Sequence, residues 1–69
     1  MVSIVVRAAA KTLALVYDSI SDARSCLAPA TDMFEGTTIA QVDIDGMTRY
    51  MEGKTSRPLD VGGLMSLLQ

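Results

Sequence analysis

The sequence predicts a small α+β domain in which one antiparallel β-hairpin lies between a long N-terminal helix and a short C-terminal helix. Two observations support this helix–hairpin–helix order. Asp45-Gly46 lies between two β-prone runs in the middle of the chain, and apolar residues recur at helical spacing before them. A chain of 69 residues suits one domain, which we expect to span residues 1–69.

The first segment, from Ser3 to Leu27, has the periodicity of one helix face. Its apolar positions are three or four residues apart: Val5, Ala9, Leu13, Val16, Ile20, Ala23 and Leu27. The alanines at 8–10 favour helix, Ser3 is a candidate N-cap, and Pro29 ends the pattern. Because further apolar residues lie outside this face, we expect the helix either to be buried on two sides or to contact a neighbouring subunit.

The segment from Thr37 to Met51 predicts the hairpin, since a type I′ turn needs positive φ at both central residues and Asp-Gly provides them. A two-residue loop predicts two faces. The mostly apolar face pairs Ile44 with Met47, Val42 with Arg49 and Ala40 with Met51; the mostly polar face pairs Asp43 with Thr48 and Gln41 with Tyr50. We expect the apolar face to lie on the helices, because a lone hairpin is unstable in water.

The remaining segments connect and close the domain. We expect a connector at residues 29–36, which places Phe34 in the core, and a loop at residues 53–57. Pro58 or Asp60 begins the last helix, whose apolar residues run from Leu59 to Leu68. The adjacent glycines at 62 and 63 weaken this helix by about 1 kcal/mol each relative to alanine.

The composition bounds the function. The formal net charge is −2 and the basic residues are scattered, which argues against nucleic-acid binding. With Cys26 as the single cysteine and no histidine, an internal disulfide is excluded and a metal site is not expected. Arg7 and Lys11 interrupt the apolar run that a secretory signal needs, and no run approaches the ~20 residues of a membrane span, so we expect no presequence and no membrane segment.

The candidate motifs lack the residues that their chemistry requires. Asp43-Ile-Asp-Gly-Met-Thr48 resembles the start of an aspartyl phosphotransferase, but its threonine comes one position late. The same acids do not form a calcium loop, because Met47 and Lys54 stand at ligand positions. Gly53-Lys-Thr lacks the upstream glycine of a phosphate loop, and Cys26 lacks a histidine to activate it. We therefore predict no enzymatic activity, no catalytic, metal or cofactor-binding residue, and no cofactor.

The apolar content predicts association with protein. Apolar residues make up 49% of the chain, yet a domain of this size buries only about 60% of its unfolded surface and usually needs a disulfide, a metal or a partner. The turn is assigned to Asp45 and Gly46. The candidate interface comprises the apolar residues in excess of a small core: Ile4, Leu15, Tyr17, Leu64, Met65, Leu67 and Leu68.

The predicted order resembles the gpW-like head-completion (head-to-tail joining) proteins of tailed bacteriophages. The matching residues are Ile39-Ala-Gln-Val42, the Asp45-Gly46 turn, a second strand through Met51, and a polar loop with Thr55-Ser56 before the last helix. The resemblance implies a structural protein of the virion, assembled in the host cytoplasm, which forms a homo-oligomeric ring on a portal or tail component.

Two alternatives remain open. The first is a small regulatory or antitoxin-like module that adds its hairpin edge to the sheet of a protein partner. The second is a subunit of a larger enzyme whose site lies elsewhere.

Overall fold

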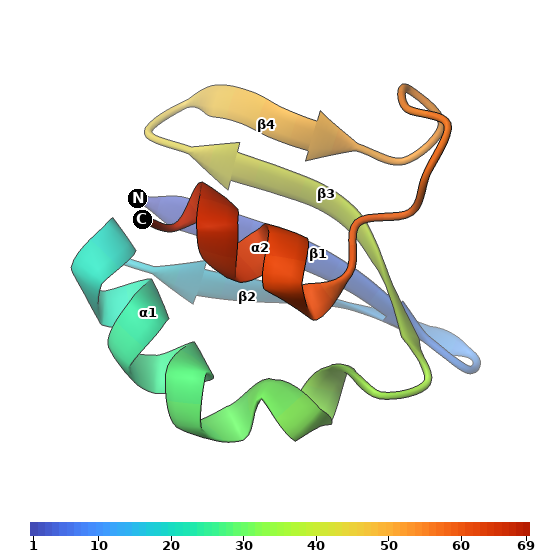
Figure 1. Cartoon of the computed structure of the whole chain (residues 1–69), viewed down its shortest axis with the longest axis horizontal. Helices are drawn as coiled ribbons and strands as arrows, with labels where there is room; N and C mark the ends of the chain where they lie inside the picture. Colours follow the sequence, from blue (N-terminus) through green and yellow to red (C-terminus); the bar gives the residue numbers. More distant parts are fainter.

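The chain forms one four-stranded antiparallel sheet with helices on one face (Figure 1). The computed structural model describes residues 1–69. The elements, in chain order, are β1 (Val2–Ala8), β2 (Lys11–Tyr17), α1 (Ile20–Leu27), the 3₁₀ helix η1 (Ala28–Phe34), β3 (Thr37–Ile44), β4 (Met47–Met51) and α2 (Val61–Leu67). The fold is α+β, but the predicted helix–hairpin–helix order is wrong: the order is β-β-α-β-β-α.

The first correction concerns the predicted helix from Ser3 to Leu27, most of which forms a hairpin that the sequence did not predict. β1 and β2 are antiparallel partners joined by a two-residue turn at Ala9 and Ala10. The buried side chains of β1 are Val2, Ile4 and Val6, which follow the period of two that a strand requires. Their β-branched side chains are restricted in a helix and pack well on a pleated surface, so this segment is a strand.

Only the end of the predicted helix is helical. α1 begins after Ser19, whose hydroxyl oxygen accepts a hydrogen bond from the backbone N–H of Asp22 at 3.1 Å. This N-cap satisfies one of the free donors in the first turn of α1. After Leu27 the chain continues as η1, which places Phe34 in the core before Gly36 turns the chain into β3.

The second hairpin, β3–β4, turns at Asp45 and Gly46, whose φ values are 51° and 81°. Ile44 pairs with Met47 and Asp43 with Thr48, as the sequence predicts. Beyond these pairs the predicted register is wrong, because the register shifts and Val42 faces Tyr50 instead of Arg49. The bulge turns the Tyr50 ring into the core, where its hydroxyl accepts the Leu59 N–H at 3.3 Å.

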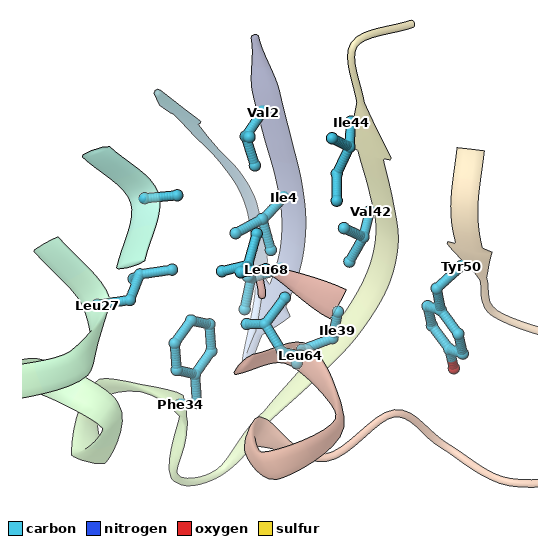
Figure 2. Packing of buried hydrophobic residues seen from close by; sticks show 12 residues of the cluster. Val2, Ile4, Leu27, Phe34, Ile39, Val42, Ile44, Tyr50, Leu64 and Leu68 are labelled. Carbon is cyan, nitrogen blue, oxygen red and sulfur yellow. The ribbon is translucent and has the colours of Figure 1, made fainter. Parts of the chain in front are cut away.

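The core lies between the sheet and the helices, and both hairpins contribute to it (Figure 2). Leu27 and Phe34 from the α1–η1 segment and Leu64 and Leu68 from the α2 segment point toward the sheet. The Arg24 guanidinium donates a hydrogen bond to the Leu68 carbonyl oxygen at 2.9 Å, which ties the end of α2 to α1. The buried residues of the core are all apolar or aromatic: Val2, Ile4, Val6, Ala23, Leu27, Phe34, Ile39, Val42, Ile44, Tyr50, Leu64 and Leu68.

The chain consists of two similar halves, each with the order β-β-α. The first strands of the two halves, β1 and β3, are antiparallel neighbours at the centre of the sheet. The second strands, β2 and β4, therefore form the two edges. Both α-helices also begin with a side-chain N-cap, Ser19 for α1 and Asp60 for α2.

Candidate protein-binding edge

The predicted interface residues divide between the core and the surface that adjoins it. Ile4, Leu64 and Leu68 have no exposed surface, so these three positions must be corrected from candidate interface to core. The other four are partly buried against the same core: Leu15, Tyr17, Met65 and Leu67. Leu15 and Tyr17 belong to β2. This strand also carries exposed branched apolar side chains, which no other element with predicted interface residues has.

The exposed apolar side chains of β2 are Leu13, which is 46% exposed, and Val16, which is 55% exposed. All other large apolar side chains with comparable exposure in the chain are methionines. The helical periodicity placed Leu13 and Val16 on the apolar face of a helix, so these two residues were not predicted as interface residues. The alternation of Val2, Ile4 and Val6 was the signal that could have identified a hairpin here.

The two edges of the sheet differ in regularity. β2 pairs with β1 over seven residues without a register shift, whereas β4 has five residues and a bulge. Bulges, short strands and charged residues discourage pairing with another chain, and β4 has all three, with Arg49 at the bulge. β2 is longer and has no bulge, and its only charged residue is Lys11 at the start of the strand.

The hydrogen-bond pattern of the β1–β2 hairpin determines which backbone groups of β2 point outward. Ala8 and Lys11 flank the two-residue turn, so they form the hydrogen-bonded pair that closes it. Hydrogen-bonded and non-hydrogen-bonded pairs alternate along an antiparallel ladder. The N–H and C=O groups of Thr12, Ala14 and Val16 therefore point away from β1, toward the free edge.

The β2 strand also has charges only at its ends. Lys11 begins the strand and Asp18 follows it directly. On the helix side, partial burial raises the pKa of Tyr17, and the nearby Cys26 thiol raises it further, so the phenol is neutral at physiological pH. Cys26 itself is a free, exposed thiol on α1.

One ion pair connects strands on the face of the sheet opposite the helices, which we call the open face, and another lies at one end of the sheet. The Arg7 guanidinium on β1 makes a two-pronged contact with the Glu52 carboxylate after β4; its second bond, from Nη2 to Oε2, is 2.8 Å long. Hydrogen bonding to Arg7 lowers the pKa of Glu52, and the same bond raises the pKa of Arg7. This contact reaches across β3 and joins the two halves of the sheet.

The Asp45 turn contacts the first residue of the chain. The Met1 ammonium donates a hydrogen bond to Asp45 Oδ1 at 2.8 Å, and the Asp45 N–H donates to the Met1 carbonyl oxygen at 2.8 Å. The hydrogen bond from the ammonium lowers the pKa of Asp45. Asp45 and Gly46 therefore serve the turn and its contact with β1.

The concave regions of the surface are shallow. One depression of about 350 Å³ lies between η1, β3 and the segment before α2, and its carboxylates are Glu35 and Asp60. Asp60 already accepts the Gly63 N–H at 2.7 Å as the N-cap of α2. No group of three or more histidine, cysteine, aspartate or glutamate side chains is placed to hold a metal ion.

No helix combines the length and the apolar character needed to cross a membrane. Comparison of the chain with protein-family models, with curated proteins and with solved structures finds no match.

Proposed function

We propose that this protein is a protein-interaction module that binds its partner by strand pairing at the β2 edge. The observation that carries the proposal is the combination of a regular seven-residue edge strand with outward backbone groups and two exposed branched apolar side chains. In such binding, backbone hydrogen bonds provide affinity and the alternating side chains provide specificity.

This proposal retains the alternative that the sequence predicts, a module that adds a hairpin edge to a partner, but moves it to a different hairpin. The edge belongs to the β1–β2 hairpin, whereas the sequence predicted only the hairpin at Asp45-Gly46. The virion head-completion role stays a prediction. Its basis was the helix–hairpin–helix order, and no feature of the β-β-α-β-β-α fold favours it.

The test compares the two edges by site-specific cross-linking in cells. A photoreactive label is attached to a cysteine at Thr12 on β2 or at Thr48 on β4, in a Cys26→Ser background. Both positions are exposed and lie on edge strands, so a cross-link from Thr12 detects a partner at the β2 edge and one from Thr48 a partner at the β4 edge. We expect discrete cross-linked proteins from Thr12 and not from Thr48.

A second variant, Ala14→Pro, tests whether strand pairing causes these cross-links. The Ala14 N–H points outward, so proline removes a donor that the β1–β2 ladder does not use, and edge strands tolerate proline at such positions. We expect Ala14→Pro to remain folded and to lose the Thr12 cross-links. Equal cross-linking from both edges, or cross-links unaffected by Ala14→Pro, would refute the proposal.

A further inference from the structure

We propose that the strand that pairs with β2 is β2 of a second copy of this chain, antiparallel, with Ala14 on the two-fold axis. This inference rests on the proposed function and names the partner. β2 is self-complementary in three respects: its outward backbone groups, its side chains and its charges.

The outward N–H and C=O groups of two antiparallel β2 strands can pair with each other. A two-fold axis that relates antiparallel neighbours in one sheet runs perpendicular to the sheet, so paired residues must lie on the same face. With the axis at Ala14, the outward groups of Thr12 meet those of Val16 in the second copy, and Ala14 meets Ala14. These three pairs give about six hydrogen bonds between the copies, because each hydrogen-bonded pair exchanges two.

The side chains match in the same register. On the open face the small Ala14 lies at the axis, and the exposed Val16 lies opposite Thr12 of the second copy. On the helix side Leu13 lies opposite Leu15, so the pairing covers both exposed branched side chains of β2. Lys11 lies opposite Tyr17, where its ammonium can contact the face of the ring.

The charges favour this direction of pairing and this partner strand. Lys11 begins β2 and Asp18 follows its end, so antiparallel pairing brings the positive end of one copy to the negative end of the other. Parallel pairing of two β2 strands would instead bring the two lysines together. Pairing of β2 with β4 of the second copy would meet the bulge at Arg49, which interrupts a regular ladder.

The dimer that results has one continuous eight-stranded antiparallel sheet, with the helices of both copies on the same face. The α1–η1 segment flanks the β2 side of the sheet (Figure 1). The two α1–η1 segments therefore face each other across the axis, and they leave β4 as the outer edge of each copy.

The register can be tested by cysteine cross-linking in the Cys26→Ser background. In the proposed dimer two residues at position 14 have Cα atoms about 5.5 Å apart, within the range for a disulfide or a short bismaleimide link. Two residues at position 12 are offset by four residues along the strand, about 13 Å. We expect Ala14→Cys to give a covalent dimer and the matched control Thr12→Cys to give none.

The assembly state is measured by sedimentation equilibrium over a wide concentration range. We expect a dimer that dissociates on dilution, and an association constant that falls by about tenfold or more in Leu13→Lys, which buries a charge opposite Leu15. The control is Met47→Lys, a more exposed apolar residue at the other edge, and we expect it to leave the association constant unchanged. Circular dichroism checks that each variant is folded.

The outcomes separate this inference from the proposed function. A monomer at all concentrations whose Thr12 position still cross-links to a different protein overturns self-pairing and leaves the function standing. A dimer that Met47→Lys disrupts and Leu13→Lys does not also overturns self-pairing. A monomer without cross-links from β2 overturns both.

Discussion

Replacing Ala9 by glycine should stabilise the protein, and the sign of this effect distinguishes the hairpin from a helix. Ala9 has a φ of 45°, in the left-handed region that a side chain with a Cβ atom disfavours. If residues 3–27 were helical, glycine at this position would instead cost about 1 kcal/mol. The same substitution therefore has opposite effects in the two folds.

The magnitude follows from two opposing contributions. The left-handed conformation costs an alanine about 1–2 kcal/mol, which glycine removes. Glycine makes the unfolded chain more flexible, at a cost of about 0.4–1 kcal/mol. The free energy of unfolding should rise by about 0.5–1 kcal/mol, which corresponds to an increase in Tm of about 2–8 °C for a domain of this size.

The assay is thermal and urea denaturation followed by circular dichroism, with Ala10→Gly as the matched control. Ala10 occupies the second position of the same turn but is not in the positive-φ region, so glycine there should be neutral or mildly destabilising. A loss of stability in Ala9→Gly equal to that in Ala10→Gly would refute the hairpin turn.

Three further predictions follow from the core, the caps and the ion pairs. Leu64→Ala and Leu68→Ala, at fully buried positions, should each lower the free energy of unfolding by about 2–5 kcal/mol in urea denaturation; losses below about 1 kcal/mol would show that these side chains are not enclosed. Ser19→Ala should lower the free energy of unfolding by about 1 kcal/mol, because the α1 N-cap is lost. The control Ser21→Ala, at an exposed neighbouring position, should leave it unchanged, and equal effects of the two substitutions would contradict the cap. The folded-state pKa of Glu52 is lowered, so the stabilisation by its pair with Arg7 is fully present above the ordinary pKa of 4.5 and is lost as the pH falls through the lowered value. Glu52→Gln should therefore reduce the dependence of the urea midpoint on pH below about pH 5, and an unchanged dependence would contradict the pairing.

The second half of the chain was largely predictable because its turn has a strong local signal. Asp45-Gly46 supplies positive φ at both central turn residues, and the two pairs next to it have the predicted register. The register beyond them was not predictable, because Arg49 carries no local signal for a bulge. The bulge serves the core, since it brings the large Tyr50 ring inward to pack near Leu59.

The first half was mispredicted because its apolar residues are so closely spaced along the sequence that they fit both the helical and the strand periodicity. Spacings of three and four residues fit the segment, but so does the alternation of Val2, Ile4 and Val6. The turn at Ala9-Ala10 contains no glycine, asparagine or proline, so local chemistry suggested a helix there. Pairing of β1 with both β2 and β3 overrides the helical propensity of the alanines, and this pairing depends on distant residues.

The candidate binding edge was missed for the same reason. Whether Leu13 and Val16 are exposed depends on β2 lying at the edge of the sheet, which the sequence of β2 itself does not determine. The sequence predicted more apolar residues than the core can hold. Two of the residues chosen for that excess, Leu64 and Leu68, are instead buried against the sheet by the α2 segment.

Residue-resolved hydrogen exchange of the β2 amides, measured in dilute protein and again at high concentration, tests the free edge most directly. In dilute protein we expect slow exchange at Leu13, Leu15 and Tyr17, which bond to β1, and fast exchange at Thr12, Ala14 and Val16. At high concentration the second set should become protected. Uniform protection along residues 11–17 in dilute protein, or no gain of protection at Thr12, Ala14 and Val16 on association, would contradict a free edge strand that pairs with a partner.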